Sequence, residues 1–484
     1  MTISSFTSLL VWLPIGAALV VWAVPLSRYA TGSLAVLVSV FEVGIWIEQA
    51  ARFDFGRRGL QFSQHASWFK DLHVSYHVGE YAFSLWLVGL TVVAMAACIG
   101  YGFWVGRERP RAYFGLMLFL TGATVGVFVA QDLLLFYAFF EAMLIPLYVL
   151  VGVWGGPGRL GATIKLLIYT MAGSLLMLAA MIAYGLSAGT FDLVDGPASV
   201  SRWIFLGFMF AFVIKAPLFP FHGWLPDAYR EAPPEVTAVL SGVIAKAGTY
   251  GMLRIAIAKF PEPAAYYRTL ILALAAAALV YGSLLAFQAP DFRGVVAYSS
   301  MAQSGLIALG LFSGTNLGFD GAVLQMIAHG LISTSLFLIG GTVERRTTSD
   351  QFALLGGMAK GRPALATLLM TTGIISLAVP GSAAFAAEFL ILAGVFQRAW
   401  WWAVIGACGI VLAAMYMLRL ISAVLHEARG SLVRDEAMDL RPAELALVVP
   451  LVGVLLALSA WPAGISHHSF AGDRPKQQVQ EQFR

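Results

Sequence analysis

Long apolar stretches, separated by polar connections, run through almost the whole chain. A helix of about 20 apolar residues spans the hydrocarbon core of a bilayer, and the chain holds fourteen stretches of roughly that length. Their bounds, good to a few residues, are 8–26, 30–48, 82–104, 112–130, 132–154, 161–186, 204–222, 237–257, 268–288, 294–313, 320–343, 364–397, 400–423 and 442–461. The pattern predicts an all-α polytopic membrane protein with about fourteen transmembrane helices.

Two of these stretches carry signals that break a helix. The seventh runs into Lys215-Ala-Pro217-Leu-Phe-Pro220, and the twelfth, which is too long for one straight crossing, contains Pro380-Gly381 near its middle. Proline lacks a backbone donor and clashes with the preceding turn. Irregular backbone at membrane depth is tolerated where it is buried in protein or lines a water-filled cavity. We therefore expect helices 7 and 12 to be broken.

Composition agrees with the apolar pattern. The chain is 59% hydrophobic and 12% charged, and its mean hydropathy is +0.80. Soluble proteins carry about 25% charged residues, so this composition excludes a soluble enzyme, a disordered protein and a nucleic-acid binder. The two cysteines, Cys98 and Cys408, both lie in apolar runs. They cannot supply a disulfide framework or a cysteine-based iron–sulfur or zinc site.

Lysine and arginine are unevenly distributed between the connections. Fifteen of them fall in the connections on one side of the predicted bundle, and four fall in the short connections on the other: Arg202, Lys259, Arg268 and Arg398. An excess of positive charge marks the cytoplasmic side, so we expect both termini to be extracytoplasmic. Residues 49–81 would then form a small extracytoplasmic cap, residues 425–441 would lie along the cytoplasmic surface, and a polar tail would begin at Gly472.

Ionisable side chains also occur inside the apolar stretches. They are Glu141, Lys215, Lys246, Glu388, His222 and His329. Such a group costs at least a few kcal/mol at the bilayer centre unless it is paired or hydrated. Burial disfavours the charged form of both acids and lysines, so both approach neutrality and can exchange protons. Broken helices add backbone groups and water-filled pockets beside such side chains. The pattern predicts a proton relay at mid-membrane.

Simpler explanations exist for some of these charges. His329 can be a hydrogen-bonded packing histidine. Glu141 and Lys215 can form a purely structural ion pair, although an apolar pair usually stabilises a core at least as well. Five other charged residues lie near the ends of the stretches, where we expect their heads to reach water: Glu42, Glu48, Asp132, Arg254 and Arg419.

Five segments together resemble a known family. They are FYAFFEAMLIPLYVLVGVWGG (136–156), IKLLIYTMAGSLLML (164–178), KAPLFPFHGWLPDAYREAPPEVTAVLSGVIAKAGTYGMLRI (215–255), DFRGVVAYSSMAQSG (291–305) and AHGLISTSLFLIGGTVERR (328–346). The set resembles the antiporter-like subunits of respiratory complex I, the bacterial NADH:quinone oxidoreductase, within the family shared with multi-subunit cation/proton antiporters. The M-type branch is nearest, because of the stretch GTYGMLRI (248–255) and because the chain lacks the length for the lateral helix of L-type subunits.

The resemblance implies two inverted five-helix repeats. Residues 1–111 would hold helices 1–3 and the extracytoplasmic loop 49–81. Residues 112–257 would form the first repeat (helices 4–8) and residues 268–423 the second (helices 9–13). Residues 424–484 would then hold a cytoplasmic connection, helix 14 and the polar tail.

The resemblance also implies roles for the buried charges. Glu141 and Lys215 match the entry ion pair of the family, Lys246 the central relay and Glu388 the exit group. The two histidines named above match histidines of helices 7 and 11. One departure bears on the relay: Gln303 stands where the family usually has a histidine, which puts protonation at that position in doubt.

We therefore expect a proton-translocating subunit of NADH:quinone oxidoreductase in a bacterial inner (plasma) membrane, coupled to remote redox chemistry. No cofactor is expected in this chain; FMN, iron–sulfur clusters and quinone would belong to partner subunits. The expected partners are antiporter-like membrane subunits on both sides and the lipid bilayer, without nucleic acid. The alternatives are a subunit of a multi-subunit sodium/proton antiporter or of a membrane-bound hydrogenase, and a scaffold that conducts nothing.

Overall fold

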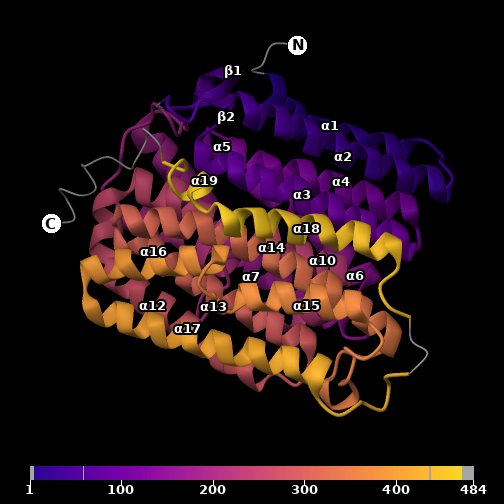
Figure 1. The fold of residues 1–484 in the computed structure, drawn as a ribbon. Coiled ribbons are helices and arrows are strands. Elements are labelled where there is room, and N and C mark those ends of the chain that lie inside the picture. Colours follow the sequence, from indigo (N-terminus) through magenta and orange to yellow (C-terminus); the bar gives the residue numbers. More distant parts are fainter. Residues whose placement is uncertain (1–4, 58, 435–437, 471–484) are drawn as a thin grey trace.

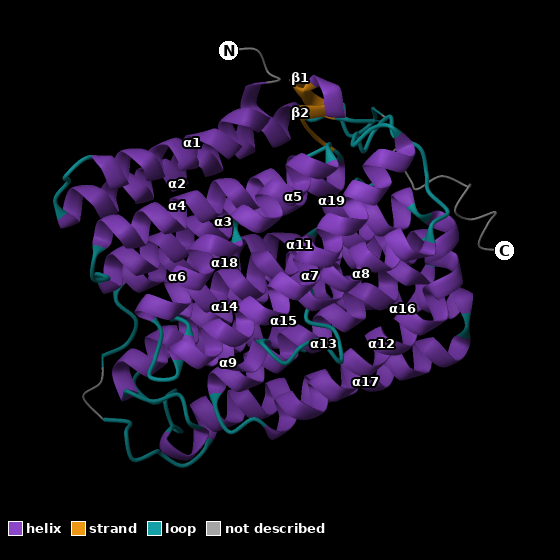
Figure 2. Ribbon diagram, turned by 180° about the vertical axis from the view of Figure 1, so that it is seen from behind, coloured by secondary structure: helices purple, strands orange, loops and turns teal. Residues whose placement is uncertain are grey.

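Helices make up most of the computed structural model, which describes residues 5–57, 59–434 and 438–470. In both views the long helices run side by side with roughly aligned axes (Figures 1 and 2). Twelve helices of the described ranges are long and apolar enough to cross a membrane. The expected all-α polytopic membrane fold is therefore confirmed, whereas the count of fourteen crossings and the inverted repeats stay predictions.

The first half of the chain supplies the upper part of the bundle in Figure 1 and part of its centre. Its helices are α1 (Ser5–Ala23), α2 (Arg28–Arg52), α3 (Ala82–Val105), α4 (Pro110–Val129), α5 (Leu133–Ala142), α6 (Leu144–Trp154), α7 (Arg159–Ala188), α8 (Arg202–Lys215) and α9 (Leu225–Glu231). One further span is continuous but irregular: α10 (Pro234–Val239), the π-helical η2 (Leu240–Ile244), α11 (Ala245–Gly251) and the π-helical η3 (Met252–Ile257). Short π-helical segments within helices are frequent at functional sites.

The second half of the chain contributes the helices from α12 onwards. They are α12 (Pro261–Gln288), α13 (Phe292–Ser313), α14 (Asn316–Thr347), the short η4 (Phe352–Leu354), α15 (Pro363–Ser376), α16 (Ala383–Arg398), α17 (Trp400–Ile421), the π-helical η5 (Ser422–His426), α18 (Pro442–Ala460) and α19 (Ala463–Ser466). The central part of α14 is wholly buried inside the protein. By contrast, α7 leaves apolar side chains such as Leu160, Ile168 and Leu186 exposed, as a helix that faces lipid does.

Both expected helix breaks are present. Helix α8 ends at Lys215, and turns replace it before α9. Helices α15 and α16 are separated at residues 377–382, where Ala378 (φ 53°) and Gly381 (φ 95°) adopt left-handed backbone conformations. The Ser382 hydroxyl then accepts a hydrogen bond from the Phe385 N–H at 3.1 Å and caps α16. Such a cap satisfies a backbone donor that would otherwise lack a partner.

One end of the bundle carries a β-hairpin. Strands β1 (Gln61–Phe69) and β2 (Val74–Glu80) pair antiparallel and are joined by the short η1 (Lys70–Leu72). Val78 forms a bridge with Ala130, and Asp132 forms one with Asp192, so three connections meet at this end (Figure 1). The cap expected from residues 49–81 is this hairpin; the side of the membrane on which it lies stays a prediction.

The connection at the opposite end is irregular at residues 427–434 and 438–441. The Leu432 N–H donates to the Leu354 carbonyl at 3.3 Å, and the Arg362 guanidinium donates to the Arg434 carbonyl at 2.5 Å. These residues therefore pack on the connection that follows α14, while most of them stay exposed; their place at the cytoplasmic surface stays a prediction. The polar tail expected from Gly472 lies outside the described residues.

Candidate functional site

The two helix segments that carry the buried lysines pack closely together. Gly248 on α11 faces the end of α8, where an added Cβ atom would lie 2.7 Å from both the Ala216 nitrogen and the Phe212 carbonyl oxygen. Glycine permits this approach because it has no side chain. Lys215 and Lys246 consequently lie on adjoining helices, and they are only 3% and 1% exposed.

Glu141 lies beside Lys215 without touching it. It is the penultimate residue of α5, and its Oε1 atom is buried without a hydrogen-bond partner in the described part of the chain. The Glu141 carboxyl interacts electrostatically with Lys215, yet no contact within 4.0 Å joins the two groups in the described structure. The Lys215 Nζ atom lies 5.1 Å from the centre of the Phe140 ring. The arrangement is an open pair rather than a closed structural salt bridge.

A chain of polar groups begins at Lys246. Its Nζ donates to the Ser241 carbonyl at 2.7 Å. The Ser241 hydroxyl lies 2.9 Å from that of Ser300 on α13 and 3.0 Å from that of Ser333 on α14. The Ser300 hydroxyl lies 3.5 Å from Nε2 of His329, also on α14. Hydroxyl groups thus connect Ser241 with His329, whereas Lys246 contacts Ser241 only at its backbone carbonyl.

The chain continues from α14 to α16. Gln325 lies one turn before His329, on the same side of α14. Its amide donates to the Gln303 Oε1 atom at 2.6 Å. The Gln303 amide in turn donates to the Glu388 carboxyl at 3.3 Å. The other Glu388 oxygen is buried and has no hydrogen-bond partner among the described residues.

We refer to these groups as the polar chain: Lys246, Ser241, Ser300, Ser333, His329, Gln325, Gln303 and Glu388. Every member is buried in the protein. A buried polar network that is mostly satisfied favours one arrangement of its helices. The polar chain connects the first-half segment that carries Lys246 with the second-half helix that carries Glu388.

Sequence reasoning found only part of the polar chain. Lys246, His329 and Glu388 were expected, but the linking residues Ser241 and Gln325 were not. The spacing of Gln325 and His329 could have indicated a polar network on this helix. Two such polar residues one turn apart are uncommon on a buried helix. That signal is weak on its own, since such residues also serve in packing.

His222 lies apart from the polar chain. It is half-buried in the turns between α8 and α9. Its ring lies 5.9 Å from that of Phe219 and 5.6 Å from that of Tyr281 on α12, measured between ring centres. Its Nδ1 atom is buried without a hydrogen-bond partner among the residues described here. Nothing in these contacts links His222 to the other candidate residues, and its relay role stays a prediction.

Several charges expected to reach water at the ends of the spans are buried instead. Glu42 on α2 is fully buried, and neither of its carboxyl oxygens has a partner within the described ranges. Asp132 is fully buried and caps α5, and Arg254 donates to the Gln131 side chain at 2.7 Å. Only Glu48 of this group is clearly exposed. The expectation was wrong for the buried three because neighbouring helices and loops cover them.

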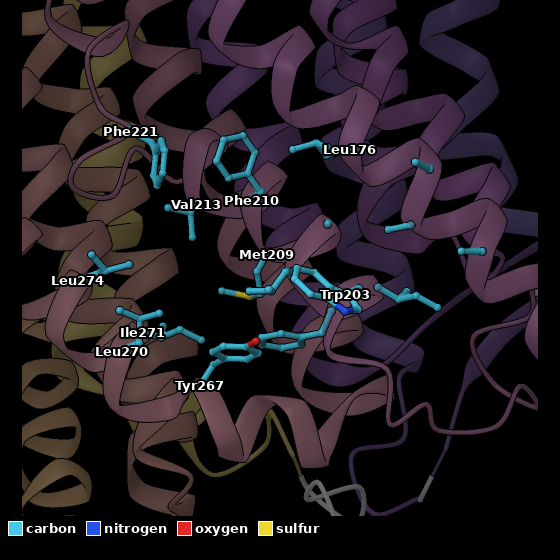
Figure 3. Close-up of a pocket in the computed structure, with 17 residues that line it drawn as sticks. Leu176, Trp203, Met209, Phe210, Val213, Phe221, Tyr267, Leu270, Ile271 and Leu274 are labelled. Atoms are coloured by element: carbon cyan, nitrogen blue, oxygen red, sulfur yellow. The ribbon is translucent and has the colours of Figure 1, made fainter.

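An apolar cavity of about 560 Å³ lies between α7, α8 and α12 (Figure 3). Trp203, Met209, Phe221 and Leu274 are among the side chains that line it. None of the candidate relay residues lines this cavity. The cavity opens to the protein surface, since Trp203 and Leu270 are exposed, and its lining is almost entirely apolar, so we place no proton path there.

The broken helices and the buried acids and lysines define an antiporter-like membrane protein. Residues 130–413 match the family described as "NADH:quinone oxidoreductase/Mrp antiporter, TM". The chain belongs to this family.

Its relatives and structural neighbours agree with that assignment. NADH-quinone oxidoreductase subunit M of Rhodobacter capsulatus is 36% identical, covering 94% of this chain and 93% of the relative. Subunit M of Mycobacterium tuberculosis is 37% identical, covering 92% and 89%. A chain of respiratory complex I from Thermus thermophilus superposes with a TM-score of 0.89 at 30% identity, covering 99% and 100%. A chain of the Mrp complex from a Dietzia species gives 0.88 at 21% identity, covering all of both chains, which shows the fold alone.

Proposed function

We propose that this chain is a proton-translocating membrane subunit of a NADH:quinone oxidoreductase in a bacterial inner membrane. The identity to subunit M relatives over nearly the whole chain supports the choice of complex. The observation that carries the translocation proposal is the row of buried polar side chains that leads from Lys246 to Glu388 across α11, α13, α14 and α16. A scaffold has no need of such a path, because buried ionisable groups are costly in a membrane interior.

In the proposed mechanism, the open pair of Glu141 and Lys215 controls the entry of protons. A carboxylate that approaches Lys215 stabilises its ammonium form, and a carboxylate that moves away favours loss of the proton. Lys246 lies on the adjoining helix and is the next acceptor. Because the pair is not closed, a small movement of α5 relative to α8 is enough to change this interaction.

Lys246 contacts the Ser241 carbonyl, which cannot relay a proton, so transfer from Lys246 to the Ser241 hydroxyl requires an intervening water. From there the proton would pass along the hydroxyls of Ser241 and Ser300 to His329. A hydroxyl can accept one proton while it donates another, so it can take part in a relay. A glutamine amide has no such titratable group. The last step to Glu388 therefore requires water beside Gln303 or a movement of its side chain.

We further propose that the hairpin end faces away from the cytoplasm, because Arg202, Lys259, Arg268 and Arg398 fall in the connections that carry little positive charge. Glu388 would then release protons toward that side. We assign the redox chemistry, with FMN, iron–sulfur clusters and quinone, to partner subunits, and expect antiporter-like neighbours on both sides of this chain in the membrane.

The proposal is tested by Lys246→Met in the intact complex in inside-out membrane vesicles. NADH oxidation and proton pumping should fall together by about tenfold or more. Lys360→Met is a matched control, because Lys360 is exposed in the connection after α14. Unchanged coupled pumping in Lys246→Met would support a scaffold. A purified complex without flavin and iron–sulfur subunits would instead indicate an antiporter.

A further inference from the structure

Two histidines and an aspartate meet at the hairpin end of the bundle, and none of them belongs to the proposed relay. His65 on β1 and His77 on β2 are register partners, and their ring centres lie 4.9 Å apart. Asp192 belongs to the connection between α7 and α8, and its Oδ2 atom lies 2.6 Å from Nδ1 of His77. One ligand atom from each of the three residues falls within 4.8 Å of the others.

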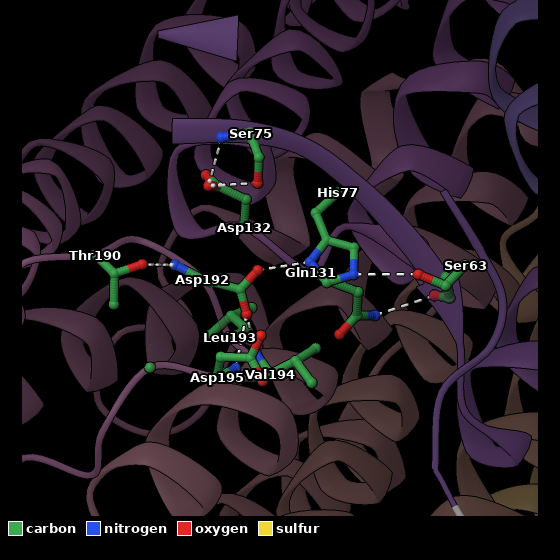
Figure 4. A network of polar contacts seen from close by, with 12 residues as sticks. Ser63, Ser75, His77, Gln131, Asp132, Thr190, Asp192, Leu193, Val194 and Asp195 are labelled. Atoms are coloured by element: carbon green, nitrogen blue, oxygen red, sulfur yellow. Dashed lines mark hydrogen bonds and ion pairs between the residues drawn. The ribbon is translucent and has the colours of Figure 1, made fainter. Parts of the chain in front are cut away.

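Neighbouring groups hold His77 and Asp192 in place (Figure 4). The Asp192 Oδ1 atom accepts the backbone N–H groups of Val194 at 2.6 Å and Asp195 at 2.8 Å, so Oδ2 is the oxygen directed at His77. On the other side of the imidazole, Nε2 lies 3.2 Å from the Ser63 hydroxyl. Metal-binding histidines and carboxylates are usually oriented by such additional hydrogen bonds.

The Asp192 carboxyl lies close to the protein surface, where an ion can reach it. Its side chain is 13% exposed and that of His77 is 8% exposed, so both lie just below the surface, while His65 is exposed and can close over them.

We propose that His65, His77 and Asp192 form a binding site for a divalent transition metal, with Zn²⁺ as the ion of best fit. Two imidazole nitrogens and one carboxylate oxygen are ligands that Zn²⁺ accepts, and water can fill a fourth position. Magnesium and calcium prefer sites built entirely from oxygen. The mixed ligand set therefore favours Zn²⁺ over both.

Binding requires only a small adjustment. Tetrahedral Zn²⁺ holds its ligand atoms about 3.3 Å from one another, since each lies about 2.0–2.1 Å from the metal. The metal takes the place of the proton between His77 and Asp192; the ring stays neutral with its proton on Nε2, which can donate to the Ser63 hydroxyl. His77 and Asp192 move slightly apart. The exposed ring of His65 turns inward to supply the third ligand.

A bound metal would fasten two segments that are distant in sequence. His65 and His77 belong to the hairpin, whereas Asp192 belongs to the connection that leads into α8. That connection is already tied to the hairpin end through the Leu193 N–H, which donates to the Gln131 carbonyl at 2.7 Å. Bound Zn²⁺ would therefore crosslink the hairpin to the connection that leads into α8, the helix that carries Lys215.

The test uses the full chain in its purified complex, with metal removed by a chelator. Co²⁺ is titrated first as a spectroscopic probe, and Zn²⁺ is then added to displace it. We expect a tetrahedral Co²⁺ absorption signal, its loss on adding Zn²⁺, and a rise in the Tm of this subunit with Zn²⁺. His65→Asn and Asp192→Asn should each weaken Zn²⁺ binding at least tenfold and abolish the rise in Tm.

His73→Asn is the matched control. His73 lies on the same hairpin but outside the cluster, and its φ of 51° is a left-handed conformation that asparagine tolerates. This variant should bind Zn²⁺ like the unaltered chain. His65 is exposed, so His65→Asn should keep the metal-free Tm even if Asp192→Asn does not fold. Unchanged Zn²⁺ affinity in His65→Asn, or an equal loss in His73→Asn, would overturn the proposal.

Discussion

The Gln303 amide donates a hydrogen bond to the Glu388 carboxyl at 3.3 Å, across the contact between α13 and α16. The same side chain accepts a hydrogen bond from Gln325 at 2.6 Å. Gln303 therefore orients the carboxyl at the far end of the polar chain, although it cannot itself carry a proton. In the proposed mechanism the two residues have different roles at this end of the chain: Gln303 orients the carboxyl, and Glu388 takes up the proton.

Replacing Gln303 tests the orienting role. Gln303→Leu removes both hydrogen bonds and leaves the Gln325 amide and the Glu388 carboxyl without partners, so we expect coupled NADH oxidation and pumping to fall about tenfold. Gln303→His restores a polar group that can also titrate, and should keep most of the activity. Equal activities of the Leu and His variants, measured in vesicles at the same complex content, would contradict this role.

Changes at Glu388 address the proton itself. Glu388→Gln keeps the size and a hydrogen-bond acceptor but cannot titrate, so electron transfer and pumping should both fall strongly. Glu388→Asp retains the acid on a shorter side chain and should fall less. The two variants are compared by NADH oxidation rate and vesicle acidification. A Gln variant that pumps as well as the Asp variant would show that Glu388 is not protonated during turnover.

The spacing of the two lysines depends on Gly248. In Gly248→Ala the new methyl group would meet the Ala216 nitrogen and the Phe212 oxygen at 2.7 Å. Backbone atoms cannot move aside as flexible side chains do, so α8 and α11 must separate. We expect a loss of about 1–3 kcal/mol in the free energy of unfolding and reduced pumping.

Gly161→Ala on α7 provides the comparison for Gly248→Ala, because nothing lies within 4 Å of its added Cβ atom. Helix propensity alone should make this variant neutral or slightly more stable. Thermal unfolding in detergent measures both variants. Identical shifts in Tm would show that the close approach at Gly248 does not constrain the helices.

A buried ion pair anchors the segment that carries Lys246. Glu235 on α10 is fully buried; it accepts hydrogen bonds from Arg107 at 2.6 and 2.8 Å and from the Tyr113 hydroxyl at 2.6 Å. Arg107→Met would leave the carboxylate without its cation and should cost about 3–5 kcal/mol. Tyr113→Phe removes one hydrogen bond to a charged group and should cost about 1.5–3 kcal/mol. Denaturant or thermal unfolding tests this order, and a larger effect of Tyr113→Phe would contradict it.

Local signals in the sequence were enough to indicate most of the long helices and the two expected breaks, but not the interruption at Met143 between α5 and α6. The Pro380-Gly381 pair marks the gap between α15 and α16 because both residues act on their own backbone. The hairpin was expected only as an undefined cap, because strands β1 and β2 lie in a connection without a clear alternation of polar and apolar residues.

Contacts between helices could not be predicted in the same way. The connection from Lys246 through Ser241 and Ser300 to His329 requires three helix segments to turn particular faces toward one another, and one sequence does not specify those rotations. The error at Glu42 has the same origin. Its position near a span end suggested access to water, but the packing of other helices over α2 decides its burial.

The Lys215→Ala variant tests the central claim most directly. Proton pumping and NADH oxidation are measured together in vesicles that contain the complex with this variant. Lys215 is the cation of the open pair, and its loss removes the group that Glu141 controls. The account predicts that both rates fall together by about tenfold or more while the complex stays assembled. Pumping and oxidation at the rates of the unaltered complex would contradict a relay of protons through these buried residues.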